Sequence, residues 1–130
     1  MGGKGSRTVP PEAILAGHSA EVMAVANAVR AQILGMIDGV VEAGHPARKL
    51  IGYRRRGAFA FVAPMADHVR LGFEHGHALP DLAGLLEGEG SQIRWVTLRS
   101  VDQVTSRGVK MLISAALFDD ETHGFRRRAP

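Results

Sequence analysis

Three of the six histidines lie close together in the sequence and are its best candidates for metal chemistry. His68 opens a predicted strand, and His75 and His77 follow that strand with one residue between them. A regular strand would separate His68 from His75 by about 20 Å, at about 3.3 Å per residue, so one ion cannot bridge them. His75 and His77 can share an ion, with Glu74 or Asp81 as a carboxylate ligand. Because two imidazoles without a third identified ligand are weak evidence for a metal site, polar loop residues without a ligand are the favoured alternative.

A second candidate site is a basic surface with one aromatic residue, made of Arg70, Trp95, Arg99 and Arg94. The stretch from Arg48 to Glu74 holds six basic and two acidic residues, so it carries the basic excess of a chain whose net charge is +3. Arginines beside aromatic rings are typical of nucleic-acid binding, and Tyr53, which precedes three arginines, would extend such a surface. The alternative, which we favour, is a solvated sheet edge, because arginine and lysine protect exposed strand edges.

The sequence contains no recognisable catalytic motif. No serine lies in a nucleophile-elbow pattern, and the glycine-rich run from Gly84 to Gly90 lacks the Gly-Lys-Ser/Thr ending of a phosphate loop. Zero cysteines exclude a thiolate nucleophile, a disulfide and a cysteine-ligated metal. The densest acidic run, residues 119–121, is expected to be a solvated helix end. We therefore expect no catalytic residues and no enzymatic activity.

Length and composition predict one globular domain. The chain has 130 residues, of which 45% are hydrophobic and 22% charged. No apolar run approaches the roughly eighteen residues that a membrane span needs, and the N-terminus lacks the apolar stretch of a secretory signal. We expect a cytoplasmic protein without a membrane partner. Its predicted parts are a flexible N-terminal arm (1–17), an α/β domain (18–119) and a charged C-terminal tail (120–130).

Two apolar stripes at helical spacing predict the helices that carry the domain. Ser19 is a suitable N-cap for the first, which runs from Val22 to about Asp38. A capping box from Ser100 to Gln103 starts a second helical region, whose stripe ends near Phe118.

Strands are predicted at 40–44, 50–54, 58–63, 68–74 and 93–99, with a loop at 75–90 that includes one helical turn at 81–86. Links this short between the strands require antiparallel pairing. The predicted fold is therefore α+β: a two-layer sandwich in which an antiparallel sheet of four to five strands has an N-terminal and a C-terminal helix packed on one face. The other face would carry the basic surface.

One segment of the loop resembles the YdhG-like family, a bacterial group of domains of unknown function. The matching residues are Gly76, Leu79, Asp81, Gly84 to Gly88, Gly90 and Arg94, and the resemblance covers about residues 19–118. It departs at Ser91-Gln92, where members carry a lysine. The resemblance implies a two-layer α/β domain, and one branch of that family is described as an iron chaperone with a frataxin-like fold. Iron or another divalent metal is therefore the cofactor that the resemblance implies.

Two functions remain open from the sequence. The first is a non-enzymatic small-ligand or metal-binding module, iron-chaperone-like as the resemblance implies. The second is a nucleic-acid or protein interaction module that uses the basic sheet face. Nucleic acid is the less expected partner of the second, and a homodimer is a further alternative.

Overall fold

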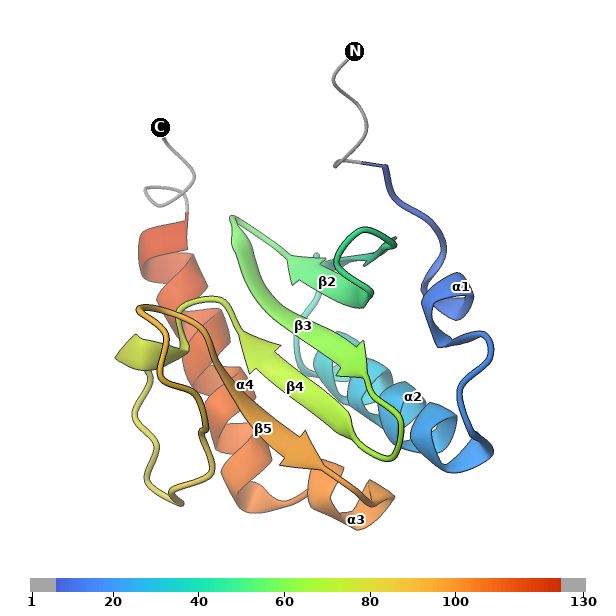
Figure 1. Cartoon of the computed structure of the whole chain (residues 1–130). Coiled ribbons are helices and arrows are strands. Elements are labelled where there is room, and N and C mark those ends of the chain that lie inside the picture. The colour runs from blue at the N-terminus through green and yellow to red at the C-terminus, as the bar shows by residue number, and fades with distance from the viewer. Residues whose placement is uncertain (1–6, 125–130) are drawn as a thin grey trace.

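Five antiparallel strands form one sheet in the described part of the chain (Figure 1). The structure is a computed structural model that describes residues 7–124. The strands are β1 (Val41–His45), β2 (Leu50–Arg54), β3 (Ala58–Pro64), β4 (Val69–Phe73) and β5 (Arg94–Leu98). Each strand pairs with the next one along the chain, in the spatial order β1-β2-β3-β4-β5. This meander confirms the predicted α+β class and places β3 in the centre.

The helices are α1 (Pro11–Leu15), α2 (Ala20–Met36), α3 (Val101–Val104) and α4 (Arg107–Asp119), with a short 3₁₀ turn η2 (Gly76–Ala78) and a π turn η3 (Asp120–Gly124). The Ser19 hydroxyl accepts a hydrogen bond from the N–H of Val22 at 3.1 Å, which confirms the predicted N-cap. The capping box between Ser100 and Gln103 is also present. None of the helices in residues 7–124 is both long and apolar enough to span a membrane.

The core lies between the sheet and the helices, which pack on one sheet face (Figure 1). Four core residues form one register row across the sheet: Ile51, Val62, Leu71 and Val96. Val29 and Ile33 of α2 and Leu112 of α4 join the same cluster, and each is at most 2% exposed. Full burial of an aliphatic side chain of this size stabilises the fold by about 1.5–3 kcal/mol, so this two-layer contact holds the sheet in place.

The segment predicted as a loosely docked arm contains ordered, buried structure. Pro11 begins α1, where its missing N–H costs nothing, and Leu15 is only 2% exposed. Val9 exchanges two backbone hydrogen bonds with Gly44, at 2.9 and 2.8 Å, so the segment also pairs with the outer strand β1. Residues 1–6 of the predicted arm and 125–130 of the predicted tail lie outside the described residues. The helical turn of the long loop is at Gly76–Ala78 rather than at 81–86.

Candidate functional site

The sheet face opposite the helix layer, which none of the described helices covers, is the candidate site (Figure 1). Side chains alternate along each strand, so the residues between the core positions point to this side. We call it the open face, and its central residues are Ala43, Gly52, Phe61, Ala63, Arg70, Gly72, Trp95 and Thr97. It joins all five strands and is therefore held rigidly by the sheet.

The ring of Phe61, in the central strand, packs against the backbone of β4 because its neighbour there is a glycine. Phe61 pairs with Gly72, and a Cβ atom added at Gly72 would overlap the tip of the Phe61 ring. The guanidinium carbon of Arg48, from the turn between β1 and β2, lies 5.7 Å from the centre of this ring. Arg48 also contacts Glu74 at 3.5 Å, and Phe61 is left only 7% exposed. The ring is thus buried, although no core residue covers it.

Trp95 of β5 forms the second arginine–aromatic pair of the open face. The guanidinium carbon of Arg70 lies 4.7 Å from the centre of the Trp95 ring, a geometry that stabilises by about 0.5–2 kcal/mol. A Cβ at Gly88 would lie 2.8 Å from Cζ3 of Trp95, so the loop backbone closes off one edge of the indole. Among residues 7–124, Arg70 has no carboxylate oxygen within 4.0 Å, and its buried Nε has no hydrogen-bond acceptor. No carboxylate of the described residues therefore neutralises the charge of Arg70.

The other two predicted arginines are placed differently. Arg99 lies 3.6 Å from Asp67, and both side chains are largely exposed, so this ion pair is weak. Arg94 donates hydrogen bonds to the backbone oxygens of Gly90 at 2.7 Å and Ile93 at 2.8 Å. The structure thus brings Arg70 and Trp95 together and leaves Arg99 at the margin, whereas Arg94 holds the loop. Sequence reasoning missed Arg48 as a site residue. The only feature of the sequence that could have indicated Arg48 is its position in the turn that precedes β2.

Tyr53 does not extend the basic surface, contrary to the sequence-based expectation. It shares the core face of β2 with Ile51, is 1% exposed, and donates a hydrogen bond to Glu42 Oε2 at 2.7 Å. Arg30 of α2 donates to the same oxygen at 2.8 Å. Burial, together with the hydrogen bond to Glu42, raises the pKa of the Tyr53 hydroxyl far above its usual value. Tyr53 is therefore a structural residue that joins the sheet to α2 through Glu42.

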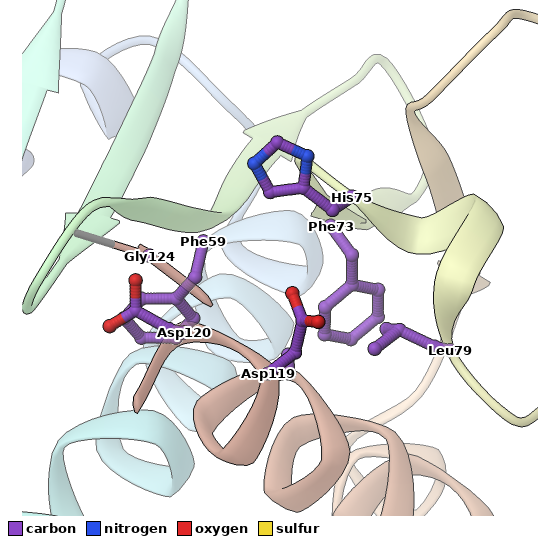
Figure 2. Close-up of a pocket in the computed structure, with 8 residues that line it drawn as sticks. Phe59, Phe73, His75, Leu79, Asp119, Asp120 and Gly124 are labelled. Atoms are coloured by element: carbon purple, nitrogen blue, oxygen red, sulfur yellow. The ribbon is translucent and has the colours of Figure 1, made fainter. Parts of the chain in front are cut away.

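The predicted histidine site is divided between two environments. His77 is exposed, and its Nδ1 lies 3.3 Å from the backbone oxygen of Gln92. His75 instead lines a small cavity of about 10 Å³ between the end of β4 and the end of α4, as Figure 2 shows. The remaining lining residues are Phe59, Phe73, Leu79, Ala116, Asp119, Asp120 and Gly124. Within residues 7–124 no group of three or more His, Cys, Asp or Glu residues could hold a metal ion.

Asp120, beside this cavity, corrects the expectation of a solvated acidic helix end. It is 3% exposed, and its two carboxylate oxygens accept hydrogen bonds from the backbone N–H groups of Arg56 at 2.9 Å and Gly57 at 2.8 Å. In the same turn, Glu121 contacts Arg55 at 3.3 Å. The end of α4 is therefore fastened to the turn between β2 and β3, and the acidic run has a structural role.

Comparison with known proteins gives a family but no relative of known activity. A family model described as Domain of unknown function (DUF5655) matches residues 12–117, which include all five strands and most of the helix layer. No curated protein and no solved structure matches the chain.

Proposed function

The chain belongs to the DUF5655 family, a family of domains of unknown function, and on this premise we propose that it is a non-enzymatic binding module whose open face takes an anionic partner. The observation that carries the proposal is the position of Arg70, whose guanidinium stacks on Trp95 and has no carboxylate partner among residues 7–124. A guanidinium held on an aromatic ring can donate charge-assisted hydrogen bonds to an anionic ligand.

The surroundings of Arg70 support an anionic rather than a neutral partner. The ion pairs of Arg48 with Glu74, at 3.5 Å, and of Arg99 with Asp67, at 3.6 Å, are long and partly exposed. Such surface pairs contribute about 0–1 kcal/mol, so a phosphate or carboxylate of the partner can replace either acidic side chain. Arg54 is exposed and lines, together with Glu74 and His75, a hollow of about 230 Å³. The arginines of the open face that an anion can use are therefore Arg70, Arg48 and Arg99.

Trp95 makes the test direct because it is the sole tryptophan of the chain. Its fluorescence is followed while inorganic polyphosphate is added, at about 50 and about 200 mM salt. We expect a saturable change at low salt and much weaker binding at high salt. Arg70→Gln should weaken binding about tenfold, the effect of losing one hydrogen bond to a charged group.

Arg107→Gln is the matched control, because it removes the same charge from the exposed start of α4 in the helix layer. It should leave the affinity close to that of the unchanged protein. Equal affinities of the Arg70→Gln and Arg107→Gln variants would contradict the proposal, since binding would then depend on total charge and not on the open face.

Metal binding, iron-chaperone-like as the YdhG-like resemblance implies, is the less supported function. It depends on His75 and His77, and the described residues offer them no third ligand in a cluster. Anaerobic calorimetry with ferrous iron and then zinc at pH 7 tests it. Micromolar binding that is lost on combining His75→Ala with His77→Ala would favour metal binding over the open-face proposal.

A cytoplasmic location and the absence of catalytic residues, both expected from the sequence, remain part of the open-face proposal.

A further inference from the structure

The two arginine–aromatic pairs lie in one register row of the sheet. Phe61 of β3 pairs with Gly72 of β4, which in turn pairs with Trp95 of β5. Neighbouring strands are about 4.8 Å apart, so the backbones of Phe61 and Trp95 are separated by about 10 Å. Each ring has an arginine guanidinium beside it, Arg48 for Phe61 and Arg70 for Trp95. The open face therefore repeats the same unit at two places.

The register row between and beside these units has small residues, and the His45 imidazole and the Phe61 ring lie against its two glycines, Gly52 and Gly72. Gly52 and Gly72 have no side chain, and Ala43 and Ala63 contribute only a methyl group each. The same row continues across these positions, since Ala43 pairs with Gly52 and Gly52 pairs with Phe61. A ligand that approaches along the row therefore meets the His45 imidazole and the Arg48 guanidinium, which are themselves planar groups.

Planar groups and negative charge occur together, at repeated positions, in a nucleic acid. Bases stack on aromatic rings and on the planes of arginine guanidinium groups, and phosphates pair with the arginine charges. Stacking of this kind needs bases that are unpaired, which excludes an intact duplex as the preferred form. An acidic protein or a simple polyanion would use the charges but gain nothing from the rings.

We infer that the anionic partner is a single-stranded nucleic acid, whose bases stack on the Arg70–Trp95 pair and on the half-exposed guanidinium of Arg48 that covers Phe61, and whose phosphates pair with the arginines of the open face. The inference rests on the proposed function, because it names the partner of the same surface. The inference adds that tight binding requires the bases of the ligand, whereas the proposed function requires only its negative charge.

The unchanged protein can test the requirement for bases without any variant. Fluorescence anisotropy is measured with a labelled single strand of about twelve uridines and with an abasic strand of the same length and charge. We expect the strand with bases to bind at least about tenfold more tightly, since stacking of one or two bases is lost in the abasic strand. A duplex of the same length should bind like the abasic strand.

Variants at Trp95 then test whether the difference in affinity between the two strands depends on this ring. Trp95→Leu should bring the affinity for the uridine strand down to that for the abasic strand, whereas Trp95→Phe, which keeps a ring, should retain most of the difference. Phe118→Leu is the matched control, because Phe118 is an aromatic residue that is 72% exposed on α4 in the helix layer. It should change neither affinity. Circular dichroism of each variant shows that the fold is intact.

The outcomes separate the inference from the proposed function. If both strands bind equally well and Arg70→Gln weakens both, the base requirement is overturned while the anion-binding function stands. If a poly-glutamate peptide of equal charge binds more tightly than the uridine strand, the partner is an acidic protein and the inference is also overturned. If no polyanion binds, both the inference and the proposed function fail.

Discussion

Individual arginines of this protein have different roles because of the sheet face on which each lies. Arg30, on the helix side, donates to Glu42 at 2.8 Å and to Glu12 at 3.2 Å, and the hydrogen bond to Glu42 raises its pKa further above the usual value. Arg70, on the open face, stacks on Trp95 and has no carboxylate partner among residues 7–124. The first arginine is committed to stability, and the second is available to a ligand.

The buried hydroxyl of Tyr53 predicts a loss of stability in alkaline solution. Burial and Glu42 raise the pKa of Tyr53 in the folded state, whereas the unfolded chain ionises near pH 10. The unfolded state therefore binds fewer protons than the folded state above about pH 10, and the free energy of unfolding falls as pH rises. We expect a decrease of up to about 1.4 kcal/mol per pH unit, measured by urea unfolding between about pH 8 and 11.

Tyr53→Phe provides the control for this titration, and it should remove the tyrosine contribution to the alkaline slope. It should also cost about 1–2 kcal/mol at neutral pH, because Glu42 loses a hydrogen-bond donor. Since Tyr53 is the sole tyrosine, tyrosinate absorbance near 295 nm reports it alone. A folded protein that gains this absorbance at the same pH as the urea-unfolded chain would contradict the buried position.

Gly72 predicts a test of the packing of the open face. In Gly72→Ala the new methyl group would overlap the Phe61 ring, so the ring must move off the sheet. We expect a destabilisation of about 1–3 kcal/mol in urea unfolding. Gly35→Ala is the opposite control, because Gly35 lies within helix α2 and a Cβ atom added there would have no neighbour within 4 Å. This substitution should stabilise the protein by up to about 1 kcal/mol. A neutral result for Gly72→Ala would mean that Phe61 is not held against this strand.

At the scale of elements, the end of α4 and the turn between β2 and β3 form one unit. Asp120 belongs to the π turn that follows α4, and it binds two backbone N–H groups more than sixty residues earlier in the sequence. The strand β3 is irregular at its start, since the register shifts between Tyr53 and Arg54. The bulge places one extra residue, Phe59, in β3 between the partners of Tyr53 and Arg54, next to the turn that Asp120 binds.

Asp120→Asn should loosen this unit. The amide NH₂ group cannot accept a hydrogen bond, so one of the two backbone N–H groups, of Arg56 or Gly57, loses its partner. We expect a loss of about 2 kcal/mol in urea unfolding and faster hydrogen exchange at Gly57. Glu121→Gln, whose side chain is 52% exposed, should change stability by less than about 0.5 kcal/mol. Equal effects of the two substitutions would show that the buried carboxylate has no special role.

The whole molecule shows which parts of such a fold sequence alone can predict. Local patterns predicted the helices capped at Ser19 and Ser100, and the short links between strands predicted their antiparallel pairing, which the structure confirms. Contacts between distant segments were not predictable in this way. The register of the β1–β2 hairpin pairs Tyr53 with Glu42, and the contact of Asp120 with the β2–β3 turn forms only when the helix layer packs on the sheet.

The same distinction applies to the candidate site. Arg70 and Trp95 were predictable as neighbours because strand alternation places both on one face, and the structure has them 4.7 Å apart. Arg94 was also predicted as a ligand residue, but it donates hydrogen bonds to the carbonyl oxygens of Gly90 and Ile93. Arg48 was missed because its reach over Phe61 depends on side-chain conformation, which no spacing in the sequence specifies.

A two-layer molecule with helices on one side of its sheet has two distinct surfaces, and the central claim is that the sheet surface binds. Nuclear magnetic resonance of the ¹⁵N-labelled protein, with inorganic polyphosphate added stepwise, tests this claim most directly. We predict that the largest shifts occur at the backbone amides of Arg70, Gly72 and Trp95 and at the indole N–H of Trp95. Shifts confined to α2 and α4, with these open-face signals unchanged, would contradict the account.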